Sequence, residues 1–229
     1  MIPATQEKRT SFQKTILRWF ASAFALSSLI CTPAFTQDWE PRDGEELRFE
    51  VLRKGNPFGF HTVRFERSGE NLTVESDIEL EVKIGPFRAF YYRHQSEENW
   101  VNEGLVSLVG ETRKDGDDFT VSVKKENDTL DVDGTLFDGE VASDIVPSSH
   151  WNIDQIRSSS ILSTESGEIL EIEVQNLGNE QIQAGGEWIS ATRYRLISEL
   201  NVDLWYDESG RWVKCSFEAR GQEIEYVLL

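Results

Sequence analysis

The sequence predicts an all-β domain, mainly β with one short helix, whose antiparallel meander curls into a barrel or half-barrel with the helix covering the open face. Two observations lead to this fold class. Hydrophobic and polar residues alternate in several segments, as they do in strands with one buried face. Short segments rich in Gly, Asn and Asp separate the alternating runs, and these residues favour the tight turns of hairpins.

The first 36 residues have the layout of a secretory signal peptide. Four basic residues precede an apolar run over 19–30, and small residues follow it. The run is shorter than the ~20 residues that a membrane-spanning helix needs. We therefore expect residues 1–36 to be cleaved off, after Ala34 or Thr36, and residues 37–229 to form a single β domain. The expected localisation is the periplasm of a Gram-negative envelope or the secreted fraction, and the mature chain is not expected to be integral to a membrane.

The chain is strongly acidic, with 41 Asp and Glu residues against 23 Lys and Arg residues and a formal net charge of −18. Residues 1–36 carry four basic residues and one acidic residue, so their removal would take the charge from −18 to −21. Nucleic-acid phosphates and anionic lipid headgroups attract Lys and Arg rather than Asp and Glu. We therefore expect no nucleic-acid partner and no docking on anionic membrane surfaces.

The alternation is clearest in "LTVESDIELEVKI", residues 72–84, where apolar residues and one serine occupy every second position and the others are polar or charged. The same period occurs in "LRFEVL" (47–52), "FTVSV" (119–123), "LEIEV" (170–174) and "VKCSFEA" (213–219). Turn segments separate the runs, at 54–59, 68–71, 102–104, 114–118, 132–134 and 207–210. Roughly ten to twelve antiparallel strands are predicted in this way, and an open sheet of that size twists and curls.

Cys31 would be lost with the signal peptide, which leaves Cys215 as the only thiol and makes an internal disulfide impossible. Cys215 shares a strand face with Val213 and Phe217. We therefore expect its side chain to be buried.

Residues 144–156, "DIVPSSHWNIDQI", interrupt the alternation. Pro147 ends the preceding strand, and Asn152 followed by Gln155 has the spacing of a helix-capping box. We expect a helix of roughly two or three turns at most. Trp151 is expected to insert against the concave sheet, so that the segment is a structural plug bordering any cavity.

Several segments resemble a family of exported bacterial domains of unknown function, namely "FGFHTVRFE", "YYRHQSEENWVNEGLVSL", "SSHWN", "ATRYRL" and "DLWYDESGRWVKCSFEARGQEIEYVLL". The resemblance covers Leu47 to Leu229 and implies that a hairpin pair of strands opens the domain and a final pair closes it. It implies no activity. The general layout is similar to the half-barrels of the periplasmic lipoprotein localisation factors, which implies a curved sheet that holds a lipid-like ligand.

Residue types that could carry chemistry occur in two places. His61 and His94 lie in phase with apolar residues, without a third ligand at a fixed spacing, so we expect core or rim histidines, no metal site and no cofactor. The 144–154 segment holds Ser, His and Asp, the residue types of a hydrolytic triad. It lacks the Gly-flanked turn that usually presents a nucleophilic serine, so a structural role is expected.

Aromatic residues are the remaining signal. Trp188 and Tyr194 share a strand face with Ser190 and Thr192, a pattern typical of a pocket for an apolar ligand and equally of a filled core. The candidate binding residues, lining or bordering a cavity, are His150, Trp151, Asn152, Phe90, Tyr92, His94, Trp188 and Tyr194.

The leading hypothesis is an exported, non-enzymatic domain that binds an apolar small molecule, a lipid or an envelope protein. One alternative is an envelope hydrolase that uses residues 144–154. Another is a structural or assembly protein without a small ligand.

Overall fold

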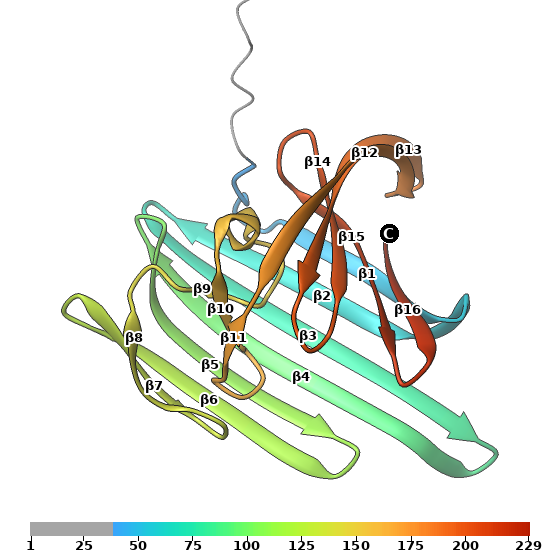
Figure 1. Ribbon diagram of the computed structural model, residues 1–229, viewed down its shortest axis with the longest axis horizontal. Helices are drawn as coiled ribbons and strands as arrows, with labels where there is room; N and C mark the ends of the chain where they lie inside the picture. Colours follow the sequence, from blue (N-terminus) through green and yellow to red (C-terminus); the bar gives the residue numbers. More distant parts are fainter. Residues whose placement is uncertain (1–38) are drawn as a thin grey trace, which may run out of the picture. The chain divides into compact units, whose positions relative to one another are not determined.

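One antiparallel sheet of 13 strands dominates the computed structural model, which describes residues 39–229 (Figure 1). Its strands are β1 (Glu46–Arg53), β2 (Asn56–Ser68), β3 (Asn71–Ile84), β4 (Phe87–Val101), β5 (Gly104–Lys114), β6 (Asp117–Glu126), β7 (Thr129–Gly134), β8 (Asp138–Ala142), β12 (Glu173–Ala184), β13 (Glu187–Ile197), β14 (Val202–Asp207), β15 (Trp212–Ala219) and β16 (Gln222–Leu228). The order in the sheet is β12-β13-β14-β15-β16-β1-β2-β3-β4-β5-β6-β7-β8. The predicted all-β antiparallel meander is confirmed. The last strand, β16, pairs with the first, β1, in the middle of the sheet.

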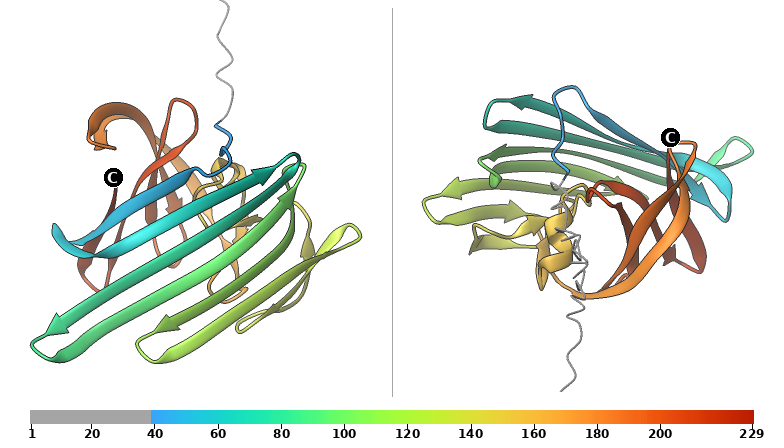
Figure 2. Two further views of the ribbon diagram at one scale, coloured as in Figure 1. Left: turned by 180° about the vertical axis from the view of Figure 1, so that it is seen from behind. Right: turned by 90° about the horizontal axis from the view of Figure 1, so that it is seen from above.

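The sheet curls without closing, which confirms the predicted half-barrel. Its edges, β12 and β8, are not hydrogen-bonded to each other. The chain between them forms a smaller sheet of order β11-β10-β9 and one short helix; the elements are β9 (Val146–Pro147), the 3-10 helix η1 (Ile153–Arg157), β10 (Ser160–Leu162) and β11 (Ile169–Glu171). Figure 2 shows this segment lying across the open side of the curled sheet, between its two edges.

The curl brings distant strands together at one end of the half-barrel. Arg220, in the turn between β15 and β16, pairs with Asp115, in the turn between β5 and β6, at 3.1 Å between Nη1 and Oδ2. Strands β1 to β4 lie between these two hairpins in the sheet. The ion pair therefore joins opposite walls of the curl.

Alternation along each strand turns one face to the interior and one to solvent. In β1, Leu47, Phe49 and Val51 are buried, whereas Glu46 and Arg48 are exposed. The largest fully buried side chains of the described residues are Trp212, Tyr206, Phe49 and Phe65. The core therefore lies inside the curl.

Helix η1 is short and is held from both sides. Asn152 accepts a hydrogen bond from the backbone N–H of Asp154 (2.9 Å), as expected of a helix N-cap. Gln155 points inward instead of forming a capping box, and its Nε2 donates to the hydroxyl of Tyr206 (2.7 Å). The predicted strand at 170–174 is divided between β11 and β12 at Ile172.

The expected signal peptide, its cleavage site and Cys31 lie outside the described residues. Within residues 39–229, no helix is long and apolar enough to cross a membrane.

The thiol of Cys215 is expected to react slowly with a thiol reagent in the native protein and rapidly after addition of denaturant. Its side chain is 1% exposed, and burial raises the pKa of the thiol well above its usual range. The thiolate is the reactive form, so both access and ionisation are suppressed. Spectrophotometric labelling with and without urea tests this expectation, and immediate native labelling would contradict it.

Candidate functional site

Residues 143–172, called the plug here, lie on the concave face of the sheet. At two points the plug backbone rests directly on strand backbone, and both strand positions are glycine. A Cβ atom at Gly110 would lie 2.2 Å from the carbonyl oxygen of Thr164, and one at Gly134 would lie 2.5 Å from that of Ser166. Side chains at these two positions would push the plug away from the sheet.

Trp151 inserts from the plug into the core, as the sequence predicts. It is 7% exposed, and its ring makes edge contacts with Phe65 (5.6 Å between centroids) and Trp100 (5.5 Å). Its Nε1 donates to Oε2 of Glu98 (3.1 Å), an oxygen that also accepts from Nε1 of Trp100 (2.9 Å). One carboxyl oxygen therefore connects the plug to β4.

Glu98 itself is 0% exposed, and its second oxygen, Oε1, has no hydrogen-bond partner in the described structure. Burial raises the pKa of this carboxyl group, although the N–H donors of Trp100 and Trp151 and the nearby hydroxyl of Ser149 favour the charged form. A buried carboxyl group with one free oxygen is unusual, because an unmade hydrogen bond in the interior costs stability.

Other interior polar groups near Glu98 are also unpaired. Within the part of the chain that the structure describes, six buried side-chain atoms lack a partner, and they belong to five residues that we call the polar cluster: His61, Ser76, Ser96, Glu98 and Ser149. Ser76 of β3 and Ser96 of β4 are paired across the ladder, and His61 of β2 lies opposite Ile78 of β3. Ser149 comes from the plug. The cluster therefore spans three adjacent strands and the segment that covers them.

The three histidines line the same interior. Nδ1 of His94 lies 2.8 Å from Oγ1 of Thr112, and Nδ1 of His150 lies 3.0 Å from Oε1 of Gln155. Burial lowers the pKa of all three, and for His61 the nearby His150 and His94 lower it further. The interior therefore favours neutral imidazoles.

The rings of His61 and His150 both contact Trp212, at 5.4 and 5.6 Å between centroids. Within residues 39–229, no group of three or more His, Cys, Asp and Glu side chains could hold a metal ion.

The remaining candidate residues are spread over the interior and beyond it. Phe90 is half-buried against Phe58 (5.4 Å), and Tyr92 is buried with its hydroxyl donating to Glu165 (2.6 Å). Tyr194 is half-buried against Tyr206 (6.2 Å). Asn152 serves as the helix cap described above.

Trp188 requires a correction, because it does not line the interior. It shares the strand parity of Tyr194, but it lies near the tip of the β12–β13 hairpin and is 69% exposed. Alternation predicts which face of a strand a side chain occupies, and not whether another element covers that face.

The residue types of a hydrolytic triad in the 144–154 segment are not brought together. Asp154 is exposed and pairs with Arg157 (2.6 Å), whereas His150 pairs with Gln155. The hydroxyl of Ser148 lies 3.5 Å from that of Thr164. Ser148, His150 and Asp154 therefore each have a separate partner, whereas the hydroxyl of Ser149 lies near Glu98 without one.

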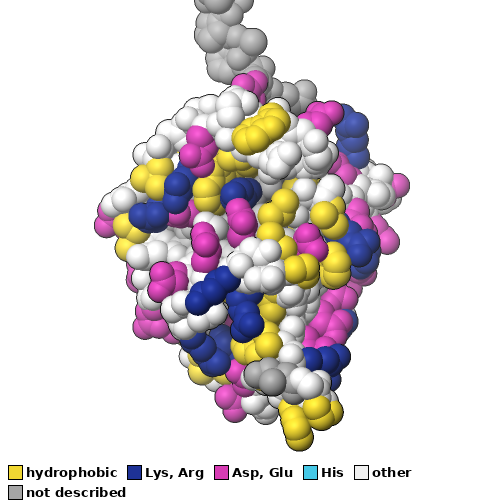
Figure 3. All heavy atoms as spheres, turned by 90° about the vertical axis from the view of Figure 1, so that its right-hand side faces the viewer, with side chains coloured by type: hydrophobic (Ala, Val, Ile, Leu, Met, Phe, Trp, Pro, Cys, Tyr) yellow, Lys and Arg dark blue, Asp and Glu magenta, His cyan; other side chains and the backbone are white. Residues whose placement is uncertain are grey.

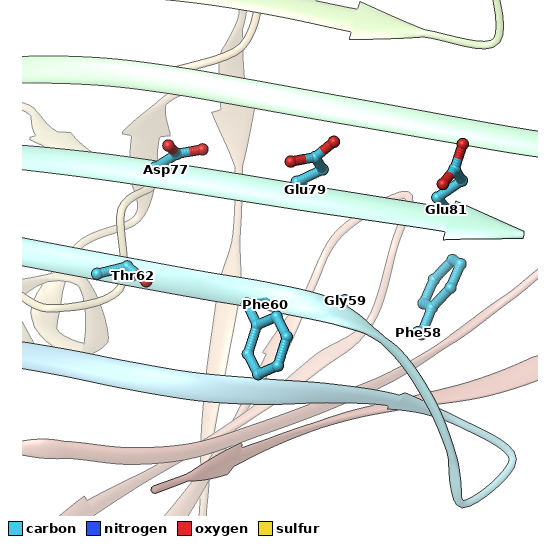
Figure 4. A pocket seen from close by; sticks show the side chains of 7 residues that line it. All are labelled: Phe58, Gly59, Phe60, Thr62, Asp77, Glu79 and Glu81. Carbon is cyan, nitrogen blue, oxygen red and sulfur yellow. The ribbon is translucent and has the colours of Figure 1, made fainter.

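Two open hollows lie on the outer face of the sheet. Figure 4 shows the first, which is lined by Phe58, Gly59, Phe60 and Thr62 of β2 and by three acids in a row on β3. These acids already have cationic partners: Arg93 pairs with Asp77 (3.1 Å) and Glu79 (2.8 Å), and Arg88 pairs with Glu81 (2.8 Å). Their charge is therefore neutralised by side chains of the protein.

The free edge of β12 is a further candidate surface. This strand is 12 residues long and pairs only with β13 in the large sheet. Residues 175–181 are all exposed, and the strand contains no Lys, Arg or Pro. The opposite edge strand, β8, has five residues. The sheet thus has one long edge and one short edge.

The residues predicted from the sequence did not include two serines and one glutamate of the polar cluster, Ser76, Ser96 and Glu98. The alternation pattern of the sequence nevertheless contains a signal for them. Ser76 occupies an apolar position of the 72–84 alternation, and Glu98 has the parity of the buried Trp100. Polar residues in an apolar phase are positions where a buried polar site can occur.

Comparison with known proteins agrees with the observed architecture. A family model described as "Domain of unknown function (DUF6134)" matches residues 49–229. No curated protein matches the chain. Among solved structures, the chain is similar to the crystal structure of a beta-barrel-like protein of domain of unknown function DUF1849 from Brucella abortus, with a TM-score of 0.58, 8% identity, and coverage of 83% of this chain and 98% of that chain. At this identity the likeness shows the fold alone.

Proposed function

The chain belongs to the family of the domain of unknown function DUF6134, and we propose that this member is an exported, non-enzymatic domain that binds an envelope protein by pairing an extended segment of it with the free edge of β12. The observation that carries the proposal is the length and exposure of this edge. Exposed edges are templates for strand addition, and natural sheets usually protect them by short length, Lys or Pro.

The composition of β12 supports recognition through the backbone. Five of its 12 residues are Asn or Gln, and only Glu173 and Glu180 are charged. The register shifts between Asn176 and Gly178, which leaves Leu177 as an extra residue in a bulge. The regular part of the edge is therefore 179–184, and it ends where the N–H of Gly185 donates to the carbonyl oxygen of Leu228 in β16 (2.9 Å). Its length suits a partner strand of about six residues.

The charge of the chain favours a partner segment that is neutral or basic. The net charge is −18, and a second copy of the chain would bring the same charge to the interface. Figure 3 shows that Lys and Arg side chains lie among Asp and Glu on one face of the molecule, without a single large basic patch there.

The packing of the interior is the reason for preferring the envelope protein over the apolar small molecule or lipid. Trp151 and the plug occupy the concave face, and the two open hollows lie on the outer face. A lipid or other ligand large enough to fill the concave face would have to displace this packed segment. Ser148, His150 and Asp154 have separate structural partners, which supports a non-enzymatic role.

Site-specific photocrosslinking in cells that make the full chain tests the proposal. A photoreactive residue at Gln181 is expected to capture a protein partner, whereas the same residue at Glu140 on the short edge strand β8 is not. N–H groups alternate between the two sides of a strand, so one of Glu180→Pro and Gln181→Pro removes an outward N–H. That variant, identified by an unchanged unfolding midpoint, is expected to abolish capture from a neighbouring probe at Gln183. Equal capture at Glu140, or an adduct with twice the mass of the chain, would contradict the proposal.

Export is expected to remove the residues before position 35 or 37. Positive charge, apolar length and small residues in the first 36 positions all fit cleavage by a signal peptidase after Ala34 or Thr36. Intact-mass measurement of protein released from the periplasm tests this. Recovery of periplasmic protein that still begins at Met1 would contradict it.

A further inference from the structure

The polar cluster lies apart from the β12 edge and has no role in the proposed partner binding. Its five residues are each at most 7% exposed, yet they present six atoms without a hydrogen-bond partner in the described structure. Buried polar groups in folded proteins are nearly always paired with protein, ordered water or ligand. Six such atoms in one interior therefore indicate that water or ligand groups lie beside them.

The arrangement of the cluster indicates a built site. Ser76 and Ser96 face each other across the β3–β4 ladder, and Glu98 follows Ser96 on the same face of β4. Ser149 approaches Glu98 from the plug, and its proximity favours the carboxylate form of that group. Hydroxyls and a carboxyl oxygen thus occupy adjacent interior positions of β3 and β4 beneath the plug, and the imidazole of His61 lies on β2, one same-face position further along the ladder from Ser76.

We propose that the polar cluster binds uncharged hydroxyl groups, supplied either by water or by the hydroxyl end of a small apolar molecule. A hydroxyl group donates one hydrogen bond and accepts two. Serine hydroxyls and a neutral imidazole can both donate and accept hydrogen bonds, so they are suitable partners for it. The surroundings are aromatic: His61 contacts Phe49 (6.1 Å between ring centroids), Trp212 (5.4 Å) and Tyr226 (5.8 Å). The apolar part of a bound small molecule would therefore pack against these aromatic rings.

Charge argues against an anion in the cluster, and the number of ligands argues against a metal ion. An anion would lie beside Glu98 with no Lys or Arg in the cluster to compensate its charge. A metal ion needs several ligating side chains, and residues 39–229 contain no group of three or more that could hold one. Burial also lowers the pKa of His61, which keeps its ring neutral.

The sign of the change in melting temperature of serine-to-alanine variants tests whether the polar cluster is occupied. If the cluster is empty, Ser76→Ala and Ser96→Ala each remove an unpaired hydroxyl and should raise the melting temperature. If a hydroxyl group is bound, each variant breaks a hydrogen bond, and we expect the melting temperature to fall by about 2 to 4 °C. Ser122→Ala, at a half-buried position of β6, is the matched control. Oxygen-17 relaxation dispersion of water, which counts long-lived buried waters, provides a second measurement.

The two sources of the hydroxyl group are separated by comparing protein purified natively from its envelope with protein refolded from denaturant. Native mass spectrometry that finds an added mass only in the first sample assigns a small molecule, and loss of that mass in Ser96→Ala supports the site. Equal masses, with fewer long-lived waters in Ser76→Ala and Ser96→Ala, assign water. Melting temperatures that rise or match the Ser122→Ala control, with an unchanged water count and no added mass, would overturn the proposal.

Discussion

Replacing Trp151 by alanine is expected to lower the free energy of unfolding by about 3 to 5 kcal/mol, as truncation of large core aromatics does. The change removes edge contacts with Phe65 and Trp100 and the indole N–H that Glu98 accepts. It also removes the side chain that holds the plug on β4. Urea unfolding followed by circular dichroism measures the loss.

A matched control for this variant exists in the same chain. Trp188→Ala deletes the same side chain at a position that is 69% exposed, so its effect should stay within about 0.5 kcal/mol. Trp151→Phe keeps an aromatic ring and loses only the N–H, which separates packing from hydrogen bonding. Similar effects of Trp151→Ala and Trp188→Ala would mean that the plug does not contribute to stability.

Replacing His150 by alanine is expected to destabilise the protein because of its contact with Gln155. In the structure its Nδ1 pairs with Oε1 of Gln155, which is 0% exposed, so the variant leaves a buried amide oxygen unpaired. We expect a loss of about 1 to 3 kcal/mol in the free energy of unfolding, measured in the same urea titrations. A loss below the Trp188→Ala control would contradict this.

Acidification is the second change with a large expected effect: the free energy of unfolding should fall steeply below about pH 6.5. Burial lowers the pKa of His61, His94 and His150 in the folded state. Each then contributes stability that is full above the unfolded-state pKa and is lost as the pH falls below it. Three extra protons bound by the unfolded chain give a limiting slope of about 4 kcal/mol per pH unit.

Glu98 acts in the opposite direction. Its pKa is raised in the folded state, so it holds a proton that the unfolded chain releases, and its contribution decreases as the pH rises above the usual carboxyl value. Glu98 offsets at most one of the three histidine protons, so the histidine effect should determine the sign of the slope. Urea unfolding at several pH values from 7.5 to 5 measures the slope, and His61→Phe is expected to reduce it by about 1.4 kcal/mol per pH unit. A slope that does not change in His61→Phe would show that His61 is charged in the folded protein.

The parts of the fold that were predictable from the sequence are those that depend on local periodicity. Alternation along 72–84 gave the correct faces of β3, and Pro147 with Asn152 marked the segment that covers the sheet. Trp151 was predictable because a large indole in a non-alternating segment has few places to be buried.

Features that depend on distant parts of the chain were not predictable in this way. The exposure of Trp188 depends on whether any element lies opposite the β12–β13 hairpin tip. The polar cluster depends on register, because Ser76 and Ser96 are paired only through the β3–β4 ladder. Ser149 reaches the cluster only because glycines in β5 and β7 let the plug backbone approach. Register and covering elements are tertiary properties that a two-residue period does not encode.

The pairing of β16 with β1 has a consequence for the order of folding. The sheet order makes β16 the strand that joins β12–β15 to β1–β8, and Phe49 of β1 is paired with Leu228. The first strand therefore cannot complete its pairing until the last strand is present. The long sequence separation between β1 and β16 raises the contact order, which slows folding. Most of the chain must be available before the large sheet can be completed, so the nascent protein remains open until its final residues emerge. For a chain that crosses a membrane before folding, this delay would keep it in a form that a translocation channel accepts.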